Sequence, residues 1–170
     1  KKNKEIIVLS GMPNKKYIQC NEYGSYKKII TDELGFNNLS NDLSFDILLA
    51  GDSFAHGVCV EQKKETHNLL NDRGYKTYTI GYSGNGPLLT LASLTEVKDH
   101  IDFDNIIWLF FRNDFYDISW ESKNNNLIKY LNKDFNGIDY FKNLEKVTNY
   151  QQNYINNNLP TKKGFNYQES

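Results

Sequence analysis

Three short apolar runs organise the middle of the chain, and each one ends at glycine or polar residues. They cover residues 45–50, 75–80 and 106–111. The first run does not alternate cleanly between apolar and polar positions, which is typical of strands covered on both faces in a parallel sheet, and the third is almost continuously apolar. We therefore expect three parallel strands.

The segments between these runs predict helices. Residues 61–72 carry apolar positions at helical spacing and end before Gly74, which suits a helix stop. A second stretch starts at Pro87, where the first turn of a helix tolerates proline, and its apolar stripe runs toward His100. Alternating strands and helices predict an α/β fold with a parallel sheet.

The two flanks of this core differ from it. The N-terminal part has short apolar pieces separated by turn residues, which favours short strands, such as a hairpin packed on the main domain. Spacings of three and four predict helices over 127–131 and 138–155, followed by a polar, mobile tail from Asn156. The expected organisation is an N-terminal extension at 1–44, an α/β core at 45–120, and a helical segment with a polar tail at 121–170.

Size and charge limit the classes of function. A chain of 170 residues that is 39% hydrophobic can form one domain with a real core. Its 20 basic and 21 acidic residues give a net charge of -1, so no global attraction to nucleic acid or anionic membrane is expected. No apolar run approaches the roughly 20 residues of a membrane-spanning helix. No signal peptide precedes Ile6, and removal of an anchor or signal before Lys1 stays open.

The two cysteines, Cys20 and Cys59, have a separation that fits neither a redox pair nor a zinc site. They are either free buried thiols or a disulfide that ties the N-terminal segment to the loop after Ser53. A disulfide would place the chain in an oxidising compartment, outside the cytoplasm or in the cell envelope. Neither a metal nor a cofactor is expected.

Candidate chemistry follows each apolar run. In an open α/β sheet, ligands bind outside the carboxyl ends of the strands. Ser53 follows the first run, Gly84 the second and Asn113 the third. A serine hydroxyl and its N–H, a backbone N–H unshielded by Cβ, and an amide donor together suit the oxyanion of acyl transfer. We expect these three residues to face one ligand.

These residues carry a resemblance to a known family. Blocks I, II and III of the SGNH/GDSL hydrolases are similar to three segments of this chain, in the same order. They are Gly51-Asp52-Ser53-Phe54-Ala55-His56-Gly57 (block I), Ser83-Gly84-Asn85-Gly86-Pro87 (block II) and Arg112-Asn113-Asp114 (block III). The resemblance covers about residues 45–120.

The resemblance implies a fold, an activity and roles for residues. The fold would be a flavodoxin-like, three-layer α/β/α sandwich with a parallel sheet, incomplete at its C-terminal end. Ser53 would be the nucleophile of an ester hydrolase, and its N–H would form an oxyanion hole with Gly84 and Asn113. The substrate would be a small acyl ester or an acylated carbohydrate.

The chain departs from the family in its catalytic base. The family's fourth block, Asp-x-x-His, does not occur after Asn113, and His56, His67 and His100 all precede that residue. The sheet also has three expected strands where the family usually has five. The simplest account is a chain that stops short of this block. We expect His56 to point sideways from the Ser53 hydroxyl, and the other two histidines to be structural or solvent-exposed.

Other polar and aromatic residues near the strand ends have expected roles. Asp52 should hydrogen-bond loop N–H groups, and we count it with Arg112 and Tyr116 among the candidate substrate-binding residues. Arg112 and Asp114 should shape the loop around Asn113, although Arg112 could also meet an anionic substrate group. Trp120 could contact substrate. The aromatic side chains of the third run are expected in the core: Trp108, Phe110 and Phe111.

Several functions stay open on the sequence alone. Besides a serine ester hydrolase, these are an acyltransferase on envelope polysaccharide and a non-catalytic binding module of the same fold. A nucleotide-binding domain is a weaker alternative, because the glycines at 81, 84 and 86 lack the spacing of the dinucleotide fingerprint. No nucleic-acid partner is expected, and the oligomeric state is unassigned.

Overall fold

A parallel sheet of three strands, in the order β4-β3-β5, forms the centre of the computed structural model, which describes residues 6–22, 24–40 and 42–158. The strands are β3 (Ser44–Ala50), β4 (Thr77–Thr79) and β5 (Asp102–Trp108). Leu48 of β3 pairs with Tyr78 on one side and with Ile106 on the other. The parallel sheet and the mixed α/β class expected from the sequence are confirmed.

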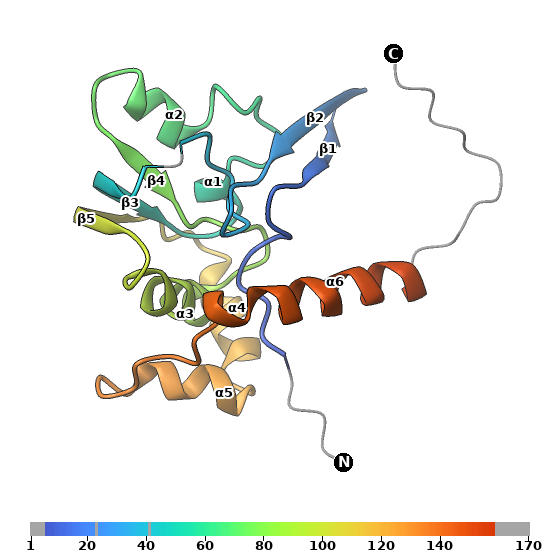
Figure 1. Cartoon of the computed structure of the whole chain (residues 1–170), viewed down its shortest axis with the longest axis vertical. Helices are drawn as coiled ribbons and strands as arrows, with labels where there is room; N and C mark the ends of the chain where they lie inside the picture. The colour runs from blue at the N-terminus through green and yellow to red at the C-terminus, as the bar shows by residue number, and fades with distance from the viewer. Residues whose placement is uncertain (1–5, 23, 41, 159–170) are drawn as a thin grey trace.

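The helices follow the strands and continue into the C-terminal part (Figure 1). They are α1 (Ser53–His56), α2 (Thr66–Asn71), α3 (Pro87–Val97), α4 (Asp114–Glu121), α5 (Asn125–Ile128) and α6 (Leu144–Asn158), with short 3-10 turns η1 (Lys129–Leu131) and η2 (Phe141–Asn143). Figure 1 shows α6 extending beyond the sheet, past the hairpin of β1 and β2.

Some helix bounds differ from those expected. The helix predicted over 61–72 begins only at Thr66, and α4 was not predicted at all. The helix predicted over 138–155 starts as a 3-10 turn at Phe141 and then continues to Asn158. Asn156, predicted to begin the polar tail, is therefore helical. The rest of the predicted polar tail, 159–170, lies outside the described residues.

The predicted N-terminal hairpin is present. Strands β1 (Lys16–Glu22) and β2 (Ser25–Ile30) pair antiparallel. Ile18 pairs with Lys28 and Cys20 pairs with Lys27, which leaves Gln19 as an extra residue in a β-bulge. The apolar piece at residues 6–9, expected as a strand, forms none.

A disulfide joins Cys20 of β1 to Cys59, with 5.3 Å between the Cα atoms. Of the two alternatives left open by the sequence, the structure has the disulfide. The bond attaches the hairpin to the loop that follows α1, and therefore to the segment that contains Ser53.

One hydrophobic core unites all three parts of the chain. Leu48 of β3 and Ala92 of α3 belong to the same buried cluster as Leu9 and Val147, from the two ends of the described chain. Phe36 lies between the rings of Tyr78 and Phe141, with centroid distances of 6.3 and 5.9 Å. The flanking segments therefore complete the core of the sheet.

The third strand is not buried as expected. β5 pairs only with β3, and its other edge carries no strand among the described residues. Of its side chains, only Phe103 packs against the core, whereas Trp108 is 38% exposed. Phe110 and Phe111 follow the strand and are 49% and 53% exposed. The expectation that these three aromatic side chains lie in the core is wrong.

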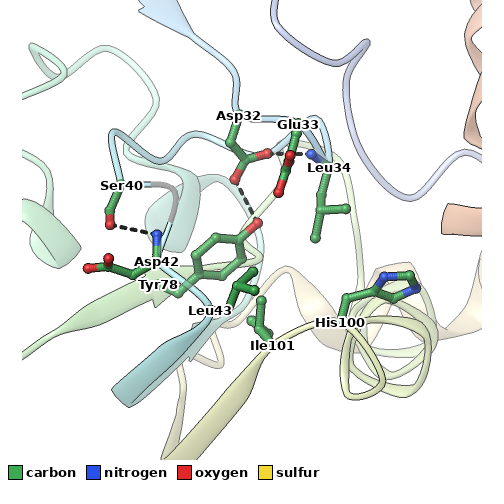
Figure 2. Close-up of a pocket in the computed structure, with 9 residues that line it drawn as sticks. All are labelled: Asp32, Glu33, Leu34, Ser40, Asp42, Leu43, Tyr78, His100 and Ile101. Carbon is green, nitrogen blue, oxygen red and sulfur yellow. Dashed lines mark hydrogen bonds between the residues drawn. The ribbon is translucent and has the colours of Figure 1, made fainter.

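Buried carboxylates connect distant segments of the chain. Asp32 accepts hydrogen bonds from the Tyr78 hydroxyl at 2.6 Å, from the Asn38 amide at 2.8 Å, and from the N–H groups of Leu34 and Phe36, both at 2.9 Å. Figure 2 shows the Asp32 carboxylate hydrogen-bonded to Leu34 and to Tyr78. Asp32 also lines a cavity of about 150 Å³. Burial raises the pKa of Asp32, and its four donors oppose that shift.

Glu96 of α3 has the same role for the C-terminal part. It accepts the Tyr130 hydroxyl and the Ile138 N–H, both at 2.6 Å, and the Tyr140 N–H at 2.7 Å. A Cβ on Gly137 would lie 2.4 Å from the Glu96 carboxylate, so this close approach of backbone requires glycine.

We expect the Glu96→Ala variant to lose about 3 kcal/mol of unfolding free energy or more, because three donors would lose their acceptor in a buried site. Urea denaturation measures the loss. The matched control is Glu145→Ala on the exposed side of α6, which should change stability by about 0.5 kcal/mol at most. Equal effects of the two substitutions would contradict the assigned role.

We expect Cys20→Ser combined with Cys59→Ser to lower the free energy of unfolding by about 2–4 kcal/mol. The disulfide spans a sequence separation of 39 residues and so restricts the unfolded chain. Dithiothreitol should lower the urea midpoint of the wild type and leave that of the double variant unchanged. A wild-type midpoint insensitive to the reductant would show that the bond contributes nothing.

Candidate functional site

The turns after β3, β4 and β5 are in direct contact. The Asn113 amide, after β5, donates to the Asp52 carboxylate, after β3, at 3.0 Å. The Ser83 N–H, after β4, donates to Nδ1 of His56 in α1, also at 3.0 Å. The structure therefore brings the three polar turns together at one edge of the sheet.

Block I forms a tight turn into α1. Asp52 is the N-cap residue, and its carboxylate accepts the Phe54 N–H at 3.0 Å, as expected for a residue that fixes the turn. Gly51 has a φ of 145°, and a Cβ there would lie 2.8 Å from the Leu109 carbonyl oxygen. Ser53 begins the helix and is partly buried. In the described structure, neither its N–H nor its hydroxyl has a hydrogen-bond partner, so both can bind a ligand.

Two glycines in and just before block II have opposite surroundings: Gly81 is tightly packed, and Gly84 is exposed. A Cβ on Gly81, just before the block, would lie 2.4 Å from backbone atoms of Ala55 and His56, so the turn packs directly on α1. Gly84 has a φ of 89° and is exposed, and a Cβ there would meet no other atom within 4 Å. Its backbone conformation favours glycine, and its surroundings leave the backbone accessible to a ligand.

Block III holds Asn113 between two carboxylates. The amide nitrogen donates to Asp52 at 3.0 Å and to Asp117 at 3.1 Å, so both of its hydrogens have acceptors. A role in an oxyanion hole requires one of these bonds to break. Asp117 was not foreseen as a partner, because its contact depends on α4, which the sequence pattern did not predict.

Asp114 shapes the same loop, as expected. Its carboxylate accepts the Phe111 N–H at 2.5 Å. Burial raises the pKa of Asp114, and the nearby carboxylates of Asp52 and Asp117 raise it further. Asp114 is therefore close to both of the carboxylates that accept the Asn113 amide.

His56 has two contacts with the segment that follows β4. Its Nδ1 accepts the Ser83 N–H, and its ring stacks on Tyr82 with 5.3 Å between centroids. Burial lowers the pKa of His56 to about 4, so the ring is neutral near pH 7.

The other histidines are structural. His67 is almost fully buried, its Nε2 lies 3.1 Å from the Asn68 amide nitrogen, and burial lowers its pKa to about 4. His100 packs edge-on against Phe141 at 5.3 Å. Among the residues that the structure describes, no hydrogen bond joins a histidine to Ser53.

The candidate substrate-binding residues differ in access. Arg112 and Tyr116 are exposed beside Asn113, and Trp120 is exposed with Lys123 Nζ 4.0 Å from its ring centroid. Asp52 is only 4% exposed, and its carboxylate accepts the Asn113 amide. The part of the chain that the structure describes has neither a metal-binding group of three or more His, Cys, Asp or Glu side chains nor a helix long and apolar enough to cross a membrane.

Glu121 is a further residue that the sequence did not reveal. Its carboxylate accepts the N–H groups of Gly86 and Leu88, both at 2.8 Å, and of Leu89 at 3.3 Å. It therefore caps α3 from α4, with its pKa raised by burial. No local pattern indicates this contact, because the donors and the acceptor are far apart in the chain.

Comparisons with protein-family models, with curated proteins and with solved structures found no match to this chain.

We expect the free energy of unfolding of the His56→Asn variant to fall less steeply at acid pH than that of the wild type. The pKa of His56 is about 4 in the folded chain and about 6.5 when unfolded, so the unfolded state gains a proton first as pH falls. The contribution of neutral His56 to the free energy of unfolding, roughly 3 kcal/mol, is fully present above about pH 6.5 and is lost as the pH falls toward 4. Asparagine can still accept the Ser83 N–H but does not titrate.

The measurement is urea denaturation of both proteins at a series of pH values. The difference between variant and wild type should be constant near neutral pH and should change in favour of the variant below about pH 6. Parallel profiles down to about pH 4 would refute the assignment.

Proposed function

We propose that the chain carries the nucleophile and oxyanion-binding turns of an SGNH-type ester hydrolase. The observation that carries this proposal is the contact between the Asn113 amide and Asp52 across the two neighbouring strands β3 and β5. The order β4-β3-β5 places the first strand of the core between the second and the third, as in flavodoxin-like sheets. In such sheets the ligand crevice opens where connections from neighbouring strands diverge.

The proposed chemistry is acyl transfer through Ser53. The Ser53 Oγ attacks the acyl carbonyl and loses its proton to a base. The bond from the carbonyl carbon to the leaving alcohol oxygen then breaks, and the alcohol leaves with a proton. Water releases the acid from the acyl-enzyme by the reverse sequence. The N–H groups of Ser53 and Gly84 support the oxyanion, and Asn113 joins them after releasing one carboxylate.

We infer that none of the three histidines of this chain is the base of this reaction. His56 is held by Ser83 and Tyr82, His67 is buried beside Asn68, and His100 packs against Phe141. The proposal therefore assigns the base to a histidine outside this chain. Small acyl groups on carbohydrate are the substrate class that the family resemblance favours.

A non-catalytic binding module is the second candidate. The observation that favours it is the occupied Asn113 amide, whose hydrogens both point to carboxylates. In that case the unpaired Ser53 and Gly84 groups would bind a ligand without reaction. An acyltransferase on envelope polysaccharide would use the same nucleophile with a sugar hydroxyl in place of water.

We expect p-nitrophenyl acetate to acetylate Ser53 when free imidazole supplies the missing base. Peptide mapping by mass spectrometry should find one acetyl group on the Ser53 peptide of the wild type. The Ser53→Ala variant should lack this adduct, whereas Ser122→Ala, a matched change in an exposed serine after α4, should retain it. Release of p-nitrophenol beyond the Ser53→Ala background measures the rate.

Absence of the Ser53 adduct in the folded wild type, with imidazole present, would reject the hydrolase proposal in favour of the binding module. As a second test, Gly84→Ala should lower the acetylation rate, because its φ of 89° strains any side chain there.

A further inference from the structure

The bulged residue of the hairpin lines a cavity beside block II. Gln19 has no pairing partner in β2, and bulges commonly redirect a side chain next to a site. The cavity, of about 190 Å³, is also lined by His56 and Ser83. Both the oxygen and the nitrogen of the Gln19 amide are buried and have no hydrogen-bond partner among the described residues.

An unpaired buried amide requires an explanation. More than about 90% of buried polar groups in proteins have a partner, and an unpaired group costs about 1–3 kcal/mol. Because no bond holds the Gln19 amide in place, it can turn toward a molecule in the cavity that it lines. A ligand with hydroxyl groups would satisfy both its donor and its acceptor.

A second cavity adjoins the first. It has a volume of about 330 Å³ and shares Tyr17 and Tyr82 with the first as walls. Its far side is formed by α6, through Tyr150, Gln151 and Tyr154. We call the two adjoining cavities the tyrosine groove. The second cavity alone falls within the range of about 300–1,000 Å³ that is typical of small-ligand sites, and the first adds to it.

The second cavity also has an unpaired amide group. The Gln151 nitrogen donates to the Ser10 carbonyl at 2.8 Å, whereas its oxygen is buried without a partner in the described structure. The tyrosine groove therefore has an amide group in need of hydrogen bonds in each of its two parts.

The lining of the tyrosine groove selects a neutral ligand. No Asp, Glu, Lys or Arg is among the described residues that line either cavity. A charged ligand would thus lose water without gaining a counter-charge. Tyrosine rings offer flat apolar faces, and glutamine amides offer paired donors and acceptors. A pyranose ring has the complementary surfaces, with C–H groups on its faces and hydroxyl groups around its edge.

We propose that the tyrosine groove binds a neutral oligosaccharide, held by the Gln19 and Gln151 amides and stacked on the tyrosines. The ligand would extend from the β1 bulge to α6, past Ser83 of block II. If the proposed function also holds, this places a sugar next to Gly84, where its acyl group could reach Ser53. That last step rests on the proposed function, whereas saccharide binding does not.

The test is isothermal titration of the Ser53→Ala chain, which cannot form an acyl-enzyme. The probes are cellohexaose, xylohexaose and hexa-N-acetylchitohexaose, with hexagalacturonate as the charged comparison. We expect at least one neutral oligosaccharide to bind and hexagalacturonate not to bind. Failure of all three neutral probes, or equal binding of the acidic one, would overturn the proposal.

Variants locate the binding in the groove. Gln19→Leu should weaken binding of the best probe by about five-fold or more, because the amide bonds to the ligand are lost. Tyr154→Ala, at a residue that is 60% exposed, should weaken it by a similar factor. The matched controls are Gln152→Leu, on the exposed side of α6, and Tyr75→Ala, away from the groove, and both should bind as the parent does.

Thermal unfolding separates a binding role of Gln19 from a structural one. Since Gln19→Leu removes an unpaired buried amide, the melting temperature without ligand should be unchanged or raised. A lowered melting temperature, or unchanged affinity in this variant, would overturn the proposal. Because the titration involves no acyl chemistry, its failure is distinguishable from a failure to acetylate Ser53.

Discussion

The structure depends on a few carboxylates that are buried without a cationic partner. Such a group is stable inside a protein only when several donors replace its lost water. Asp32, Glu65, Glu96 and Glu121 are each at most 8% exposed, and each accepts hydrogen bonds from amides, hydroxyls or backbone N–H groups of other segments. The ion pairs that the structure describes lie instead on exposed or partly exposed side chains. Hydrogen bonds from neutral donors to these buried carboxylates, and not ion pairs, therefore attach the N-terminal and C-terminal segments to the sheet.

The sequence predicted the strands and most helices better than it predicted which of their side chains are buried. Glycine and polar residues after each apolar run correctly indicated the strand ends, and the alternation of strands and helices indicated the parallel sheet. The exposure of Phe110 and Phe111 could not be predicted, because a run has the same apolar content whether or not another element covers it. Helix α4 was missed since its apolar side chains, such as Phe115 and Trp120, are exposed and form no buried stripe.

In the candidate site, too, the positions of the residues along the sheet were predictable from the sequence, whereas their side-chain contacts were not. That Ser53, Gly84 and Asn113 lie on turns in contact follows from parallel strands, whose carboxyl ends share one edge. The direction of His56 and the two acceptors of Asn113 depend on side chains that are distant in sequence. The bulge at Gln19 depends on the register between β1 and β2, which two short strands with many polar residues do not specify.

Helix α4 is in contact with the site at both ends. Asn113 precedes it and bonds to Asp52, and Glu121 ends it and caps α3 at Gly86. One residue added or removed between these ends would rotate one contact by about 100° around the helix axis relative to the other. The two end contacts therefore constrain the length of α4, which is 8 residues. In related chains, insertions should therefore fall before Asn113 or after Glu121, and not between them.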